Sequence, residues 1–250
     1  MFEKLKDIVE FGYKITTLGN LTISPPEMPL GEDEDLKITK IGKKMAIPGS
    51  SIKGLVRSNL ESKLSELGKE VCVPSVTLPR NKKERESYLK RINRRNPDDC
   101  MKEPCPICLI FGNTYRGGAL SGRAIFLDAF SDSDINDYTL VRTHVAIERS
   151  RRVQSSKKLV ELSAVEGGVE FKGTIRIINP ENWMVGALRR ALETAEFTGI
   201  GGKKSAGYGQ VSIEIKNPVI FKFGSKGWKP EERDWDDYIK SFNDKFGISS

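Results

Sequence analysis

The spacing of apolar residues most constrains the fold of this 250-residue chain. Two segments repeat apolar residues at helical spacing, so that one stripe of each would face a core. Elsewhere apolar and polar residues alternate, which is typical of strands with one buried face. The expected elements are strands at residues 11–18, 123–130, 169–178 and 208–215 and helices at 50–67 and 183–197. This β-α-β-β-α-β order predicts an α+β, ferredoxin-like (RNA-recognition-motif-like) core, in which two helices cover one face of a four-stranded antiparallel sheet and leave the other free.

The remaining residues are expected as insertions within a single domain spanning residues 1–250. These segments are an acidic loop at 19–47, a cysteine-containing region at 68–122, a basic hairpin at 131–167 and a C-terminal extension at 217–250. Aromatic residues among charges in the extension predict an additional helix that packs on the domain or on a partner.

The charge balance favours an acidic partner. Forty-one Lys and Arg residues against 34 Asp and Glu residues give a formal net charge of +7 and a pI near 9.1. Nucleic acid is the commonest partner of such proteins. No apolar run approaches the ~20 residues that span a membrane, and the first residues lack the apolar core of a signal peptide. We therefore expect a cytoplasmic protein.

The cysteines have the spacing of a metal site. Cys100, Cys105 and Cys108 fall within nine residues, and two residues separate the last two. This gap lets two thiolates bind one tetrahedral ion, for which zinc is the usual occupant. The fourth ligand is expected to be Cys72, the only other cysteine, or His144, the only histidine. Disulfides are the alternative, although cytoplasmic thiols are kept reduced. The expected zinc is structural and stabilises the 68–122 insertion.

A glycine-rich connection, GIGGKKSAGYGQV at residues 199–211, joins the second helix to the last strand. Glycine permits positive φ and close approach of a ligand, so that successive N–H groups can converge on an anion beside Lys203 and Lys204. A plain helix C-cap is the alternative, because glycine commonly follows a helix. Neither a P-loop nor a dinucleotide-binding loop is matched, since Lys204 stands where each requires a different residue. The pattern favours contact with a phosphate backbone.

Basic residues are concentrated in two insertions. The cluster at residues 80–95 suits either a solvated helix face or an acidic ligand. A second cluster lies in a hairpin expected from strands at 141–153 and 159–162, where arginines can follow a phosphate track. Its members are Arg142, Arg149, Arg151, Arg152, Lys157 and Lys158.

Several segments together carry a family resemblance. Residues 47–57, IPGSSIKGLVR, closely resemble the segment that opens the first helix of RAMP proteins in type III CRISPR effector complexes. Residues 105–112, followed by 122–129, resemble the cysteine, Phe-Gly and strand-Asp-Ala sequence of that family, and 199–209 resembles its glycine-rich signature. The resemblance is best to the Csm/Cmr-type backbone subunit, the seventh Cas family, which polymerises along the guide RNA.

The resemblance implies RNA contacts at three places. The first helix would bind guide RNA through its start, where the serines are also expected to cap the helix. The hairpin would act as a thumb between bases, and the glycine-rich loop would contact phosphates. The residues expected to bind RNA are Ser50, Ser51, Lys53, Arg57, Arg149, Arg151, Arg152, Gly201, Gly202, Lys203 and Lys204. The implied partners are guide RNA, complementary target RNA, further copies of the chain and other subunits of the complex, with no membrane.

Cleavage of target RNA is the activity that the resemblance implies for active backbone subunits, through one aspartate in the loop before residue 48. Asp33 is the first candidate and Asp35 the second, since both precede a short strand expected at 36–40. The carboxylate would hold hydrated Mg²⁺ or Mn²⁺, or orient the RNA 2′-hydroxyl, and leave 2′,3′-cyclic phosphate ends. Prolines replace several glycines usual in that loop, so a non-catalytic RNA-binding subunit remains an alternative. Another is a guide-RNA-processing endoribonuclease with His144 as general base.

Overall fold

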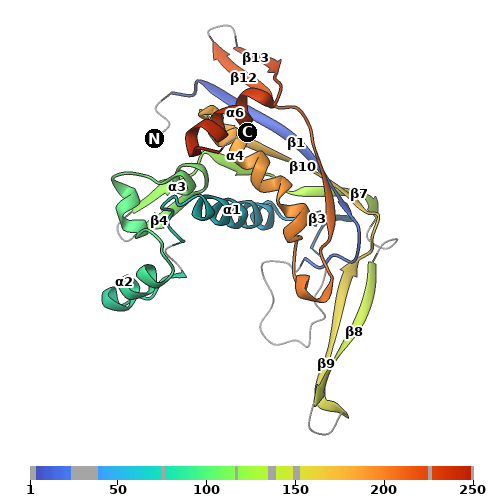
Figure 1. Ribbon diagram of the computed structural model, residues 1–250. Coiled ribbons are helices and arrows are strands. Elements are labelled where there is room, and N and C mark those ends of the chain that lie inside the picture. Colours follow the sequence, from blue (N-terminus) through green and yellow to red (C-terminus); the bar gives the residue numbers. More distant parts are fainter. Residues whose placement is uncertain are drawn as a thin grey trace.

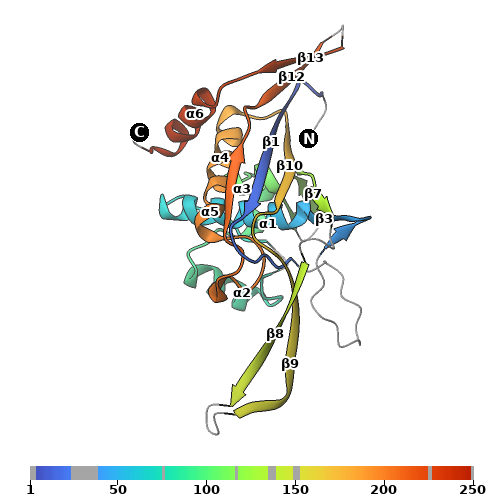
Figure 2. The ribbon, with the colours of Figure 1, turned by 90° about the vertical axis from the view of Figure 1, so that its right-hand side faces the viewer.

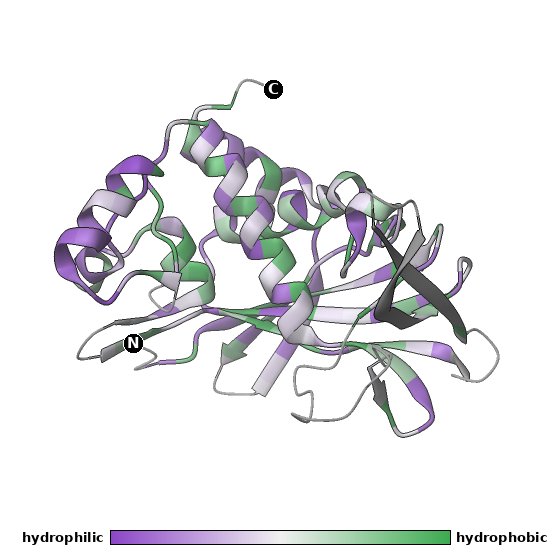
Figure 3. Cartoon of the chain, turned by 90° about the horizontal axis from the view of Figure 1, so that it is seen from below, coloured by the Kyte–Doolittle hydropathy of each residue, from purple (hydrophilic) through white to green (hydrophobic). Residues whose placement is uncertain are grey.

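The computed structural model describes residues 4–23, 39–74, 77–115, 118–134, 139–148, 153–224 and 227–248. An antiparallel sheet carries helices on one of its faces (Figures 1 and 3). Its strands are β1 (Asp7–Thr17), β2 (Lys40–Ile41), β3 (Lys44–Ile47), β6 (Ala124–Phe126), β7 (Ala129–Asp134), β10 (Glu170–Ile178), β11 (Val211–Ile215), β12 (Val219–Gly224) and β13 (Gly227–Glu232). The helices beside the sheet are α1 (Gly49–Glu66), α4 (Asn182–Glu193), α5 (Ala195–Thr198) and α6 (Asp236–Phe246).

The central strands have the order of a ferredoxin-like core. β1 pairs antiparallel with β10 on one side and with β11 and β12 on the other, while β10 also pairs with β6 and β7. Across the sheet, the strands of the predicted core therefore follow one another as β11, β1, β10 and then β6 with β7. Numbered by their order in the chain, this is the arrangement 4-1-3-2. The predicted α+β architecture with an antiparallel sheet is confirmed.

Alternating burial along β1 explains why the helices cover only one face. Val9, Phe11, Tyr13 and Ile15 are buried, whereas the residues between them are half-buried. The buried helical side chains that meet them are Ile52, Val56, Leu60 and Leu64 from α1 and Met184, Val185, Leu188 and Leu192 from α4. Fully burying one such side chain stabilises the fold by about 1.5–3 kcal/mol, so these two stripes fix the helices on the sheet.

The helix-free face of the central strands is covered by ion pairs. Lys14 on β1 contacts Glu170 at 2.9 Å and Glu214 at 3.1 Å, so it joins three adjacent strands. Arg176 pairs with Glu10, and Lys172 pairs with Asp132, in the same way. The middle of this face is therefore charged and largely neutralised.

The basic insertion forms an arm. β8 (Thr139–Glu148) and β9 (Val153–Val165) make a separate two-stranded sheet that projects from one end of the core (Figures 1 and 2). The predicted turn after residue 153 is wrong, because Glu148 already pairs with Val153. The three arginines between Glu148 and Val153 fall in the expected strand and lie outside the described residues.

The C-terminal extension contains the expected helix and a hairpin that the sequence did not indicate. α6 packs on α4 so closely that a Cβ added at Gly186 would lie 2.2 Å from the Tyr238 carbonyl oxygen. Trp235 packs edge-to-face on Phe11, with ring centroids 5.0 Å apart. β12 and β13 extend the sheet beyond β1 at the end opposite the β8–β9 arm (Figures 1 and 2). Within the described ranges, no helix is both long and apolar enough to cross a bilayer.

Candidate nucleic-acid interface and metal centre

The start of α1 is held by a strand residue and not by its own serines. Pro48 occupies the N-cap position, which has no side-chain capping hydrogen bond, and Ser50 and Ser51 lie exposed in the first turn. The prediction that these serines cap the helix is therefore wrong. The Asp128 carboxylate, between β6 and β7, instead accepts a 2.7 Å hydrogen bond from the Gly49 N–H. Both serine hydroxyls thus remain at the surface beside the helix start.

Lys53 and Arg57 border a groove of about 570 Å³ on the next turns of α1. Burial, together with the charge of Arg57, lowers the pKa of Lys53 below its ordinary value. Arg57 is more enclosed, because it donates to Glu61 at 2.7 Å and to the Gly112 carbonyl at 3.3 Å. Lys53 is therefore the more available of the two cations for an anionic ligand, while Arg57 mainly shapes the groove wall.

Part of the backbone of the glycine-rich loop is packed against protein. Gly201 has φ of +81°, and a Cβ there would lie 2.3 Å from the Thr22 carbonyl oxygen. The N–H groups of Gly199, Ile200, Gly202, Gly207 and Gly209 donate to protein carbonyls. The donors of Gly202 and Gly209 are used by close packing against residues 20–22 and are not available to an anion, while a role for the other N–H groups of the loop stays a prediction. Lys203 and Lys204 remain exposed on the loop.

Three candidate segments meet at residues 20–23. The glycine-rich loop donates from Gly202 to the Thr22 carbonyl at 3.1 Å and from Gly209 to the Asn20 carbonyl at 2.8 Å. Leu21 exchanges two backbone hydrogen bonds with Val165, the last residue of β9. Buried Tyr208 also packs with Ala164 of β9. The loop and the base of the β8–β9 arm are thus one connected structure.

The same region holds both ends of the acidic loop. Thr39 donates from its backbone N–H to the Ile23 carbonyl at 3.1 Å, and its side chain donates to the same oxygen at 3.2 Å. Ala46 of β3 donates to the Thr39 carbonyl, and β3 leads directly into Pro48 and α1. The acidic loop therefore starts and returns beside the start of α1.

Five predicted site residues lie outside the described residues. They are Asp33 and Asp35 of the acidic loop and Arg149, Arg151 and Arg152 between β8 and β9. Their roles remain predictions that rest on the sequence and on the placement of the neighbouring strands.

The four cysteines come together from three local structures. Cys72 follows α1, Cys100 lies in the 3-10 helix η2 (Pro97–Met101), and Cys105 and Cys108 lie at the start of α3 (Pro106–Phe111). Their Sγ atoms all lie within 4.8 Å of one another, and all four residues are buried. A tetrahedral zinc site with Zn–S bonds of about 2.3 Å places its sulfurs about 3.8 Å apart, so the cluster has a suitable size. These residues could bind a metal such as zinc.

The choice between Cys72 and His144 follows from the topology. The Sγ atom of Cys72 lies 3.5 Å from that of Cys105 and 2.9 Å from that of Cys108, whereas His144 belongs to β8 in the arm. Neighbours of the cluster belong to the main hydrophobic core, including Ile107 and Ile110 of α3. The cysteine region is therefore anchored on the core next to α1, and is not an insertion held by the cluster alone.

Thiol–thiol hydrogen bonds make part of the cluster acidic. A hydrogen bond with Cys100 is the main reason that the pKa of Cys108 falls to about 7. The pKa of Cys105 is also lowered, chiefly by Cys100, whereas the pKa of Cys72 is raised by its hydrogen bond with Cys100. The pKa of Cys100 is raised as well, so these hydrogen bonds favour thiolate, the form in which cysteine binds a metal, at two of the four sulfurs.

Asn113 links the cysteine cluster to the Lys53 groove. Its side-chain nitrogen lies 3.5 Å from the Cys72 Sγ and 3.6 Å from the Cys108 Sγ, and the same residue lines the groove. Asn113 lies on β4 (Gly112–Tyr115), which pairs with β5 (Gly118–Ser121). The sequence pattern does not single out this residue, because its position depends on two segments that only folding brings together.

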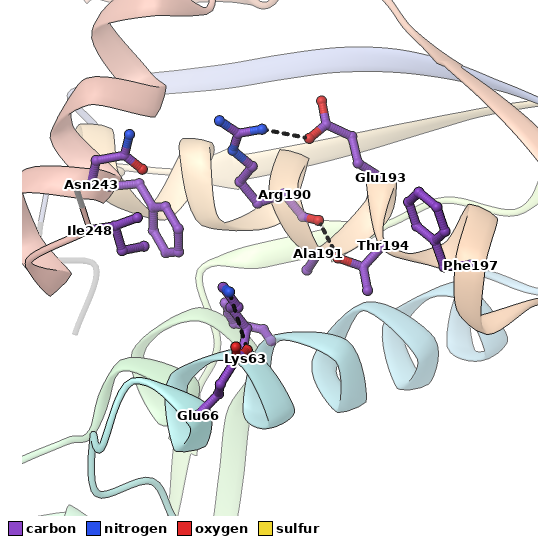
Figure 4. A pocket seen from close by; sticks show the side chains of 11 residues that line it. Lys63, Glu66, Arg190, Ala191, Glu193, Thr194, Phe197, Asn243 and Ile248 are labelled. Atoms are coloured by element: carbon purple, nitrogen blue, oxygen red, sulfur yellow. Dashed lines mark hydrogen bonds and ion pairs between the residues drawn. The ribbon is translucent and has the colours of Figure 1, made fainter. Parts of the chain in front are cut away.

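A second groove, of about 590 Å³, lies where α1, α4, α5 and α6 meet (Figure 4). Leu60, Ala191, Phe242 and Ile248 contribute apolar lining. Its charged rim is internally paired, Lys63 with Glu66 at 3.1 Å and Arg190 with Glu193 at 3.3 Å. These neutralised charges offer little attraction to a phosphate backbone, so we do not assign this groove to RNA.

Comparison with protein families gives one assignment. The model of the RAMP superfamily matches residues 15–212, which is more than three quarters of the chain. The match begins near the end of β1 and ends at the second residue of β11, so it contains the whole of β3, β6, β7 and β10. Comparison with curated proteins gives no significant match.

Proposed function

Because this chain belongs to the RAMP superfamily, we propose that it is an RNA-binding subunit of a type III CRISPR effector complex, and specifically the backbone subunit that holds the guide RNA. The superfamily acts in such complexes with RNA and other subunits. The observation that carries the proposal is the meeting of the glycine-rich loop, the base of the β8–β9 arm and the ends of the acidic loop at residues 20–23. Each of these segments is a candidate for RNA contact.

The guide RNA would run past lysines of the glycine-rich loop and of α1. Lys203 and Lys204 supply charge from the loop, and Lys53 supplies it beside the start of α1. Lysine contacts to phosphates release counterions, so binding by these residues depends on salt. The arginines between β8 and β9 would extend the contact outward along the arm.

The cysteine cluster has a structural role in this proposal. Four buried thiolates close the coordination shell of a zinc ion and leave no position for a reacting water. The ion would join Cys72 to Cys100, Cys105 and Cys108, and so hold β4 and β5 beside α1. The wall of the Lys53 groove would then depend on the metal without any chemistry at the metal itself.

Target-RNA cleavage is the finer part of the proposal. Asp33, or Asp35 in its place, would orient the RNA 2′-hydroxyl or hold a hydrated divalent ion, while a cation such as Lys53 steadies phosphate charge. The anchoring of the acidic loop at Ile23 and Thr39 supports this arrangement, because both anchors adjoin the guide-binding segments. In the alternative, the subunit binds RNA in the same way and does not cleave it.

Titration with single-stranded RNAs of graded length tests the binding role. The number of bound protomers, measured by native mass at two salt concentrations, should rise by one for each fixed increment of length. Lys203→Ala/Lys204→Ala should weaken binding and reduce its salt dependence, whereas Lys240→Ala on α6 should change neither. One protomer per RNA at every length, with a preference for hairpins, would instead favour guide processing.

Assembled complexes test the cleavage role. Asp33→Ala and Asp35→Ala assemblies are compared with Glu32→Ala and Glu34→Ala controls from the same acidic cluster. Loss of target cleavage in only one aspartate variant, with unchanged RNA binding and cyclic phosphate ends in the wild-type products, would support catalysis. Equal cleavage by all four assemblies would remove both aspartates from the mechanism.

A further inference from the structure

The tip of the β12–β13 hairpin carries an exposed pair of aromatic side chains. Phe223 and Trp228 are directly opposite in the antiparallel register, and their ring centroids lie 4.8 Å apart. Phe223 is 54% exposed and Trp228 42% exposed, whereas Trp183 and Trp235 are almost completely buried. Two large rings are thus held together at the surface.

Strand register places this pair on the helix-free face of the sheet. Ile8 pairs with Phe221 of β12 on one side and with Ile178 of β10 on the other. Paired residues point to the same face, and Ile8 alternates with the buried residues that face the helices. Phe221, Phe223, Trp228 and Pro230 therefore share the open face. These four residues are called the aromatic patch below.

Lysines lie on both sides of the β12–β13 hairpin. The Phe223 N–H donates to the Lys6 carbonyl at 2.8 Å, which brings the N-terminal segment beside the hairpin. Lys222 and Lys229 are directly opposite each other on the reverse side of the hairpin. Lys222 pairs with Glu231 at 3.0 Å and is also directly opposite Asp7 of β1, so charge on that side is partly neutralised. Of these three lysines, Lys6 is the one that the pairing with Phe223 places beside the rings.

We propose that the aromatic patch stacks bases of single-stranded RNA, with Lys6 close to the phosphates. Aromatic rings flanked by basic residues are the usual means of binding single strands without reading their sequence. The ion pairs of Lys14, Lys172 and Arg176 leave the middle of the same face unsuited to stacking. This inference rests on the RNA-binding function proposed above. It adds a contact at the end of the core opposite the β8–β9 arm (Figures 1 and 2).

Tryptophan fluorescence provides a local test. Among the three tryptophans only Trp228 is exposed, so polyuridylate should quench its emission and protect it from iodide. Trp228→Phe should retain RNA affinity, measured by anisotropy of labelled RNA, but lose the quenching. Unchanged Trp228 emission and iodide access at saturating RNA would overturn the inference.

A double variant separates stacking from charge. Phe223→Ala/Trp228→Ala should bind polyuridylate about tenfold more weakly, because one aromatic–base contact is worth about that factor. Ile125→Ala, which removes an exposed apolar side chain elsewhere on the same face, should change nothing. On an abasic polymer of equal length, wild type and double variant should bind equally.

The outcomes distinguish this inference from the general proposal. If wild-type protein binds RNA and the double variant binds equally well, the aromatic patch has no role in RNA binding while the proposed function stands. If wild type binds no RNA, both fail. If the double variant binds RNA normally but loses self-association in the absence of RNA, the patch is a protein contact and the inference is wrong.

Discussion

The Asp128 carboxylate accepts a 2.7 Å hydrogen bond from the backbone N–H of Gly49, and so fixes the start of α1 on the corner between β6 and β7. Gly49 lies so close to this corner that a Cβ would stand 2.2 Å from the Phe126 carbonyl oxygen. The proline-glycine-serine-serine segment is therefore positioned by the sheet, which leaves its serines exposed. Gly49 and the distant Asp128 therefore belong to one structural unit.

Removing the Asp128 carboxylate should destabilise the fold. Asp128→Ala leaves the Gly49 N–H without its acceptor at a partly buried helix start, and we expect a loss of about 1–2 kcal/mol in the free energy of unfolding. Urea unfolding measures this change. Asp132→Ala, which breaks only an exposed pair with Lys172, should cost clearly less. Equal losses for the two variants would show that the Asp128 hydrogen bond contributes little.

Substitution by alanine should have opposite effects on stability at two glycines of α1. Gly49→Ala places a methyl group against the Phe126 backbone and should lower stability by several times the ~1 kcal/mol that separates Gly from Ala in a helix. An added Cβ at Gly54 meets no atom within 4 Å, so Gly54→Ala should be neutral or stabilising. Thermal unfolding of both variants checks the contrast. A tolerated Gly49→Ala would mean that the corner can move away from the helix.

Zinc should bind in a one-to-one ratio and support the cysteine region. Native mass spectrometry should find one ion per chain, and Cys108→Ser should abolish this adduct because the four-thiolate shell is broken. Metal chelation should lower the melting temperature and increase proteolysis within residues 77–115. Asn113→Ala is the control, since it removes a neighbour of the sulfurs but no ligand. Four freely alkylated thiols in a native, metal-free protein would contradict the site.

We expect Lys53 to lower the free energy of unfolding at neutral pH and to contribute to RNA binding. Burial, then the charge of Arg57, lowers its pKa in the folded protein, so the unfolded chain binds more protons between that lowered pKa and the ordinary value of 10.5. The contribution of Lys53 to stability therefore rises with pH through this window. Lys53→Met should raise the free energy of unfolding at neutral pH, reduce its rise toward pH 10.5, and weaken RNA binding.

The control for this trade-off lies on the same helix. Lys63 is exposed and pairs with Glu66, so Lys63→Met should change neither the pH dependence of stability nor RNA affinity. Stability is measured by urea unfolding at several pH values, and affinity by anisotropy. A Lys53→Met variant that is less stable than wild type at neutral pH would contradict this prediction. It would show that packing of the Lys53 side chain stabilises the fold by more than burial of its charge destabilises it.

Much of the core could be predicted from local patterns. Each of α1, α4, β1, β10 and β11 buries one face. This burial appears directly in the sequence as apolar residues at helical spacing or as alternation of apolar and polar residues. The Cys105–Cys108 pair is equally local. The β12–β13 hairpin was missed because β13 contains Lys229, Pro230 and Glu231, whose composition does not indicate a strand. Pairing with β12 determines its conformation instead.

The residue order by itself determined the elements, the charge and the metal-binding residue types, because each depends on neighbours in the chain. Tertiary structure decided which distant groups meet. It brought Cys72 to the other thiols and placed Asp128, and neither Ser50 nor Ser51, as the acceptor at the start of α1. It also used the N–H groups of Gly202 and Gly209 for contacts with residues 20–22. Register placed Phe223 and Trp228 on the open face. Such contacts depend on how strands and helices pack, and no local pattern records that packing.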